Sequence, residues 1–136
     1  YNTGLKIEKY EEANELSDSI ITEKKRYVLL KTELWFNSIL LKNKCNNTFH
    51  TLVYLYAHNT DIKKDSEQNA ISNLLKGLKQ KDGNKIILLP IAGDMGLNSI
   101  GMQQQIYNIT YLPSILIDEK IKIEGFTSKE EIEKHL

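Results

Sequence analysis

Two short apolar runs, separated by a helix-forming segment, restrict this chain to a fold built around a buried sheet. The run Thr51–Ala57 is almost entirely apolar and aromatic, and Ile86–Ile91 is wholly apolar. Runs of this length are typical of strands that are covered on both faces. The segment between them, about Glu67–Gln80, repeats apolar residues at helical spacing, and Asp65 or Ser66 can cap its start. This strand–helix–strand order predicts two parallel strands joined by a crossover helix.

The C-terminal part of the sequence predicts a hairpin and a final capped helix. Ser114–Ile117 and Lys120–Glu124 have strand character, and the tight turn between them is expected at 118–119. A capping box beginning at Ser128 starts the last helix, which is expected to run to the C-terminus. A short helix over about 98–108 precedes the hairpin. The chain is therefore predicted to be an α/β protein, with a four-stranded mixed sheet flanked by helices on both faces.

The first 42 residues predict a long helical extension that precedes a domain over 43–136. No glycine or proline occurs between Leu5 and Lys76, and Lys6–Leu41 has a helical pattern throughout. A helix of that length would measure about 54 Å. Since this exceeds a small domain, its N-terminal end should project, bend back or pair with another chain. A break within 17–22, where serine, aspartate and threonine cluster, is an open alternative.

One stripe along this helix has the spacing of a coiled coil. Nine positions follow alternating steps of three and four, and seven of them are apolar or small. These positions are Ala13, Leu16, Ile20, Glu23, Tyr27, Leu30, Leu34, Asn37 and Leu41. Five of the apolar ones, Leu16, Ile20, Tyr27, Leu30 and Leu34, are the candidates for self-association.

A second apolar set occupies only the later half of the same helix. Because this half then has apolar residues on more than one side, we expect it to be buried against the domain. The set consists of Val28, Leu29, Trp35, Phe36, Ile39 and Leu40.

The charge balance argues against a general nucleic-acid binder. Lysine and arginine together number 18, as do aspartate and glutamate, so the formal net charge is zero. The densest basic run, Lys24–Arg26, is expected to be a solvated helix face. No apolar run reaches the roughly 18 residues that a membrane-spanning helix needs. Because the chain begins at Tyr1 rather than methionine, we expect it to be a fragment or a processed form, whose missing segment could hold a signal or an anchor.

Two stretches near the C-terminus resemble a known family. They are Tyr107–Ile117, which contains Leu112-Pro113-Ser114, and Gly125–Glu131. Together with the strand order, they resemble the thioredoxin fold, and in particular microbial, archaeal-type thioredoxin-like proteins that are anchored outside the cytoplasm by an N-terminal membrane segment. The resemblance covers about Thr51–Leu136. It implies that Pro113 is cis and that an extended peptide can bind beside it.

The chain departs from that family where the redox pair should lie. The best placement of the Cys-x-x-Cys motif falls on Lys63–Ser66, which contains no cysteine. Thiol–disulfide exchange needs a thiolate, so we expect a groove that retains its shape and lacks redox activity. The predicted groove residues are Lys63, Lys64, Asp65, Ser66, Leu112, Pro113 and Ser114.

The chain has one cysteine, Cys45, which cannot form an intramolecular disulfide. It precedes the first predicted strand, so we do not place the family's redox role on it. The three histidines, His50, His58 and His135, lack the spacing of metal ligands. We therefore predict no metal site and no cofactor.

Together these features predict a redox-inactive, thioredoxin-like binding or scaffold module rather than an enzyme. We expect it outside the cytoplasm, where it would hold a polypeptide partner or self-associate through the helix stripe; nucleic acid is not an expected partner. Any membrane contact would come through a segment absent from this chain. The alternatives are an oxidoreductase that uses Cys45 as a single thiol, and a purely structural extracytoplasmic domain.

Overall fold

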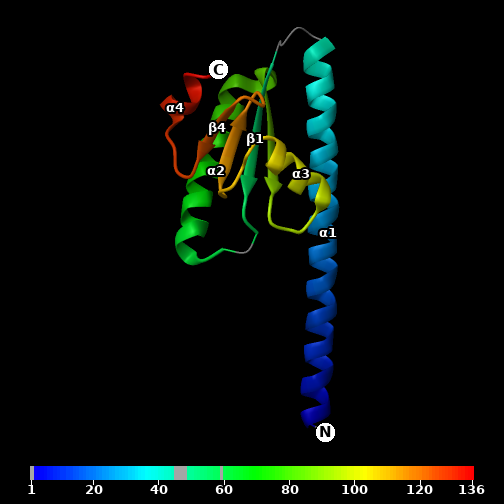
Figure 1. Ribbon diagram of the computed structural model, residues 1–136. Helices are drawn as coiled ribbons and strands as arrows, with labels where there is room; N and C mark the ends of the chain where they lie inside the picture. The colour runs from blue at the N-terminus through cyan, green and yellow to red at the C-terminus, as the bar shows by residue number, and fades with distance from the viewer. Residues whose placement is uncertain (1, 45–48, 59) are drawn as a thin grey trace.

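The computed structural model describes the backbone of residues 2–44, 49–58 and 60–136, with side chains from residue 18 onward. The described residues form four helices, a 3-10 turn and four strands (Figure 1). In chain order they are α1 (Asn2–Lys44), β1 (His50–Tyr56), α2 (Ile62–Asp82), the turn (Gly83–Lys85), β2 (Ile86–Ala92), α3 (Asn98–Ile106), β3 (Ser114–Ile117), β4 (Ile121–Glu124) and α4 (Lys129–Glu133).

The four strands form one mixed sheet in the order β2-β1-β3-β4. β1 is parallel to β2, with Leu52 opposite Leu88, and α2 is the crossover between them. β1 and β3 are antiparallel, as are β3 and β4. This arrangement confirms the predicted fold class. β1 and β2 match their predicted bounds to within one residue at each end.

Helices cover both faces of the sheet, and each face has its own apolar core (Figure 1). On one face α1 and α3 contribute Val28, Trp35 and Ile100, which pack with apolar residues of all the strands except β4. On the other face α2 and α4 contribute Leu75 and Ile132 to the second core. The alternation of strand side chains between two covered faces explains why β1 is apolar or aromatic from Leu52 to Tyr56.

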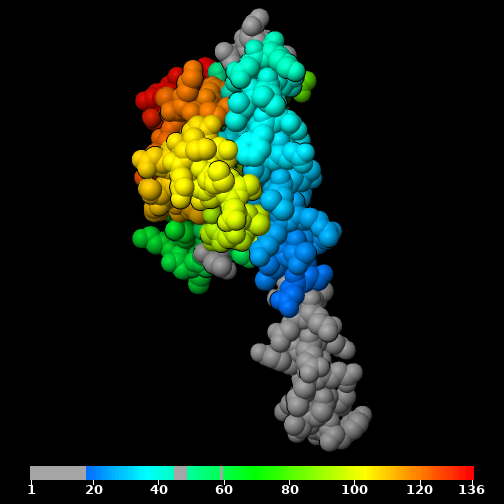
Figure 2. Space-filling model, turned by 45° about the vertical axis from the view of Figure 1, so that its right-hand side comes forward, coloured from blue at the N-terminus to red at the C-terminus, as the bar shows by residue number. Residues whose placement is uncertain are grey.

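α1 is a single helix of 43 residues with no break within 17–22. The hydroxyl of Thr22 donates to the carbonyl of Asp18 at 2.9 Å, a bond that lies within the helix and does not cap a new one. The N-terminal end of α1 projects past the domain (Figure 1). In the space-filling view the later part of the helix forms a continuous ridge along one side of the molecule (Figure 2).

The later half of α1 docks on the domain along one face. Five residues at helical spacing are buried there: Val28, Thr32, Trp35, Ser38 and Lys42. The Trp35 ring is fully buried and lies 5.7 Å from the ring of Tyr107. The prediction that the whole second apolar set is buried is wrong for two members. Leu29 and Leu40 are exposed, because the domain covers one side of the helix only.

Two helix ends differ from the prediction. α2 begins at Ile62, and its N-cap is Asp61, whose carboxylate accepts the Lys64 N–H at 2.8 Å. The predicted caps Asp65 and Ser66 therefore lie inside the helix. α4 spans only five residues and ends before the C-terminus, although its predicted N-cap, Ser128, is confirmed.

The hairpin turn and the outer strand show local sequence requirements. Asp118 and Glu119, at the predicted turn, both have positive φ, of 52° and 58°. Such values are typical of the two-residue turns that match strand twist, and Asp tolerates them. Pro90 lies within β2, which is an edge strand. Proline has no N–H to donate, and an edge strand accepts it because no neighbouring strand on the open side needs that hydrogen bond.

Candidate functional site

The loop before β3 meets the start of α2 at one end of the sheet. The peptide bond between Leu112 and Pro113 is cis. Pro113 is buried, and its carbonyl accepts the Gly125 N–H at 2.8 Å, which ties the loop to the end of β4. The buried Ser114 donates its hydroxyl to the carbonyl of Tyr111 at 2.5 Å. These bonds fix the backbone on either side of Leu112.

Leu112 itself presents unused backbone groups. Within residues 18–44, 49–58 and 60–136, no hydrogen bond is made by its N–H or its carbonyl. Its side chain is held against Gly93, where an added Cβ would lie 3.2 Å from Leu112 Cδ1. Gln104 closes the same wall by donating to the Gly93 carbonyl at 3.0 Å. A free donor and acceptor on one residue of a fixed loop can pair with an extended chain.

The first turns of α2 contribute less of the predicted groove than the sequence suggested. Lys64 is half-buried, and its ammonium lies 5.1 Å from the centre of the Tyr111 ring, within cation–π range. Lys63, Asp65 and Ser66 are exposed. The Asp65 carboxylate accepts a hydrogen bond from the Thr60 hydroxyl. Of these four residues, the structure thus brings only Lys64 to the Pro113 loop.

The earlier start of α2 moves the position at which a thiol would sit. The residues around the start of this helix are 60–64, which share only positions 63 and 64 with the predicted window. None of them is a cysteine, and the chain has only Cys45, which lies outside the described residues. The amide of Lys64 is occupied by the Asp61 carboxylate, which also places negative charge where an anion would bind. This end of α2 therefore does not favour an anion.

Exposed apolar side chains occur on all three segments at this end of the sheet. Ile62 begins α2 and is 87% exposed, Phe126 follows β4 and is 70% exposed, and Tyr111 is 40% exposed. Gly125 brings two of these segments together, since a Cβ at this residue would lie 3.6 Å from Tyr111 Cε1. Sequence reasoning missed Ile62 and Phe126, although an apolar residue directly after a helix cap is an available signal.

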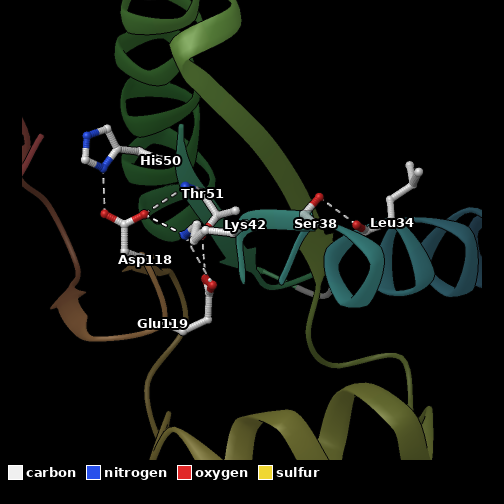
Figure 3. Close-up of polar contacts among 7 residues, drawn as sticks. All are labelled: Leu34, Ser38, Lys42, His50, Thr51, Asp118 and Glu119. Carbon is white, nitrogen blue, oxygen red and sulfur yellow. Dashed lines mark hydrogen bonds and ion pairs between the residues drawn. The ribbon is translucent and has the colours of Figure 1, made fainter. Parts of the chain in front are cut away.

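A second polar site lies at the opposite end of the sheet, and sequence reasoning missed it entirely (Figure 3). The Lys42 ammonium, from α1, lies 2.7 Å from Asp118 Oδ1 and 3.4 Å from Glu119 Oε1. It also donates to the Thr51 hydroxyl at 2.9 Å. His50 Nδ1 lies 2.6 Å from Asp118 Oδ2. The cluster joins α1, β1 and the β3–β4 turn, which are far apart in the sequence.

The environment of Asp118 lowers its pKa. Burial alone would raise the pKa of this carboxyl, but hydrogen bonds from Lys42, His50 and the Thr51 N–H favour the ionised form and outweigh it. The Thr51 N–H donates to Asp118 Oδ1 at 3.1 Å. Lys42 belongs to α1, whereas His50 and Thr51 belong to β1, so these hydrogen bonds attach both elements to Asp118. The cluster therefore ties the end of α1 and the start of β1 to the β3–β4 turn.

The predicted self-association stripe lies on the free side of α1. Ile20, Tyr27, Leu30 and Leu34 are between 47% and 59% exposed, and none belongs to either core. The side chain of Leu16 lies outside the described residues. Ile20 and Tyr27 also form one wall of a groove of about 450 Å³, whose other wall includes Tyr56, Pro90 and Met95.

Neither a cluster of metal ligands nor a membrane-spanning helix occurs in the described residues. In residues 18–44, 49–58 and 60–136, no group of three or more His, Cys, Asp or Glu side chains is placed to hold a metal ion. No helix in that part of the chain is both long and apolar enough to span a bilayer.

Comparison with solved structures identifies the fold. A malarial protein aligns with a TM-score of 0.50 at 19% identity, over 65% of this chain and 98% of that one. A chloroplastic thioredoxin z also aligns with a TM-score of 0.50, at 15% identity, over 70% of this chain and 81% of its own. No family model matches the sequence, and no curated protein matches it. Identities of this size establish architecture alone: the chain has a thioredoxin-like fold, preceded by a long N-terminal helix.

Proposed function

We propose that this protein is a redox-inactive thioredoxin-like module that holds an extended polypeptide partner at the Leu112–Pro113 edge. The observation that carries the proposal is the unused backbone N–H and carbonyl of Leu112, on a loop whose neighbours are fixed by hydrogen bonds. Two main-chain bonds to a partner would complete this edge in the manner of strand addition.

Side chains around the edge support a peptide rather than a small ligand. Tyr111, Ile62 and Phe126 are exposed apolar groups on the three segments that surround Leu112. Such groups on a protein surface are typical of interaction sites. Because the start of α2 has no thiol, the bound chain would be held without covalent exchange.

A second candidate function is self-association through α1, which would make the protein a scaffold. It is favoured by the exposure of Ile20, Tyr27, Leu30 and Leu34 on the side of the helix that the domain leaves uncovered. The alternative in which Cys45 acts as a single redox thiol has no supporting observation in the described part of the chain.

We further propose that the domain works outside the cytoplasm, anchored through a segment N-terminal to α1. The support is the sequence resemblance of 107–117 and 125–131 to anchored thioredoxin-like proteins. Fractionation of the native organism, with an antibody against this domain, tests the location. Recovery in the soluble cytoplasmic fraction would refute it.

Peptide binding is tested by adding reduced, carboxymethylated lactalbumin, a permanently unfolded chain, to the ¹⁵N-labelled protein. We expect the amide signals of Leu112 and Gly125 to shift on titration. Phe126→Ser and Ile62→Ser should each weaken binding at least tenfold. Leu40→Ser is the matched control, since Leu40 is 60% exposed but lies near the C-terminal end of α1, at the end of the sheet opposite the Leu112 edge.

Circular dichroism of each variant would establish that the fold is retained. Shifts confined to residues away from 111–114 and 124–126 would contradict the proposal. So would equal weakening by Leu40→Ser, because that result would point to non-specific apolar contact.

A further inference from the structure

The free stripe of α1 has the composition of a coiled-coil seam over three heptads. Ile20, Tyr27, Leu34 and Leu41 recur every seven residues, and all four are between 47% and 59% exposed. These are the a positions of a heptad repeat. The residues that dock on the domain, from Val28 to Lys42, lie on a different side of the helix. A second helix can therefore reach the stripe without displacing the domain.

The d positions decide which partner orientation fits. They are Glu23, Leu30 and Asn37, so two of the three are polar, whereas every a position is apolar. In an antiparallel pair, a residues face d residues of the partner, so each register sets Glu23 or Asn37 against an apolar side chain. In a parallel, in-register pair, each layer meets its own copy and the polar groups are confined to their own layers.

The polar layers are compatible with that parallel arrangement. Asn37 would face a second Asn37, and a pair of side-chain amides can donate to and accept from each other while fixing the register. Glu23 already has a cation on its own helix, since Arg26 Nη1 lies 3.1 Å from its Oε1. This contact offsets part of the repulsion between the two Glu23 carboxylates in the pair.

The surface available to a second copy continues from the helix onto the domain. Ile20 and Tyr27 also line the groove whose far wall is formed by Tyr56, Pro90 and Met95. A helix seated on the stripe would lie over the mouth of this groove. One partner would then bury both the stripe and the groove, which accounts for the apolar residues on both walls of the groove.

We propose that α1 forms a parallel, in-register coiled coil with α1 of a second copy of this chain, centred on Tyr27, Leu30 and Leu34. This inference rests on the scaffold function proposed above and names its partner. Both Leu112–Pro113 edges would then lie at the same level along the helix pair. The dimer would be two-headed and would bind a partner with two recognition segments more tightly than one head alone.

Sedimentation and light scattering across a concentration series, with reductant present, test whether the pair forms. We expect the full chain to show a concentration-dependent dimer. Leu34→Glu should weaken the dimer at least 100-fold. Leu29→Glu should leave it unchanged, because Leu29 is also 47% exposed but lies off the stripe. A mass that stays monomeric at every concentration would overturn the proposal.

Cross-linking in a Cys45→Ser background tests the orientation. Ile20→Cys should link to itself with a short bismaleimide, because identical residues face each other only in a parallel, in-register pair. Ile21→Cys is the control on the neighbouring side of the helix. If Ile20→Cys links instead to Asn37→Cys in a mixture of the two variants, the pair is antiparallel and the proposal is wrong.

The two proposals fail separately. Monomeric Leu34→Glu retains its Leu112 edge, so lactalbumin binding by that variant tests peptide binding without the dimer. A dimer that does not bind unfolded chain would remove the first function and leave this inference standing.

Discussion

The ammonium of Lys42 and the carboxylate of Asp118 meet at 2.7 Å across 76 positions of sequence. The contact joins the last turn of α1 to the β3–β4 turn, and the side chain of Lys42 is 10% exposed. Glu119 and the Thr51 hydroxyl complete the surroundings of the ammonium (Figure 3). α1 is thus fixed to the sheet by apolar packing along its later half and by the Lys42 ammonium near its end.

Removal of that cation should destabilise the fold. Lys42→Met leaves two acidic side chains near each other and largely buried, and loss of one partner from a buried pair costs about 3 kcal/mol. Urea denaturation followed by circular dichroism measures the loss. Lys44→Met, on an exposed residue of the same turn, is the control and should change the free energy of unfolding little. Equal stability of the two variants would show that apolar packing alone holds this end of α1.

The lowered pKa of Asp118 gives a defined pH dependence. Its folded-state pKa lies below the unfolded value of about 3.9, so its contribution to stability is complete above that pH and is lost as the pH falls through the folded pKa. Asp118→Asn keeps a side chain that tolerates the turn's positive φ and removes the titration. The stability gap between wild type and this variant should therefore narrow as the pH falls.

Urea midpoints between neutral and acidic pH measure that gap. Asp18→Asn, on an exposed position of α1, should follow the wild type at every pH. If the stability gap stays constant down to the lowest pH, ionisation of Asp118 does not contribute to the pH dependence of stability.

Gly125 and Gly77 should respond in opposite directions to alanine. Gly125 has a φ of +72°, and an added Cβ would lie 3.2 Å from Glu67 Oε1. We expect Gly125→Ala to cost about 1–2 kcal/mol, because a side chain disfavours the left-handed region. Gly77 lies inside α2 with open space around it, so Gly77→Ala should stabilise the protein by about 0.5–1 kcal/mol. Thermal unfolding compares the two variants, and a stabilised Gly125→Ala would contradict the observed backbone.

Trp35 should be the main apolar anchor of α1. Its side chain is fully buried in the core that α1 and α3 form with the sheet, whereas the adjacent Phe36 is only half-buried. Trp35→Ala should cost about 3–5 kcal/mol, since a large buried ring leaves a cavity. Phe36→Ala should cost clearly less. Chemical denaturation of both variants tests this order, and the reverse order would mean that the helix docks through its other side.

The sheet was predictable because its signals are local. The apolar runs that became β1 and β2, the turn at Asp118 and Glu119, and the cap at Ser128 each depend on a few neighbouring residues. The start of α2 was not predictable in the same way. Asp61, Asp65 and Ser66 are all good caps, so the residues of this segment alone do not decide where the helix begins.

The candidate sites also differ in whether their sequence signals are local. Leu112 and Pro113 were located from the sequence because they belong to a recognisable motif before a strand. The role of Lys42 was not predicted, because its partners lie 9 to 77 positions away and a lysine at the end of a helix is ordinarily solvated. Periodicity indicated an apolar stripe on α1, whose described residues are exposed, but it could not show that Leu29 and Leu40 also remain uncovered.

Pro90 has a consequence for how the protein behaves in a crowded solution. It interrupts the row of amide donors on the outer side of β2, where a strand from another molecule would otherwise attach. Growth of the sheet from molecule to molecule, the route to fibrils, is thereby disfavoured along this edge. The apolar strand β1 is thus kept inside a sheet whose β2 edge is a poor template for a further strand.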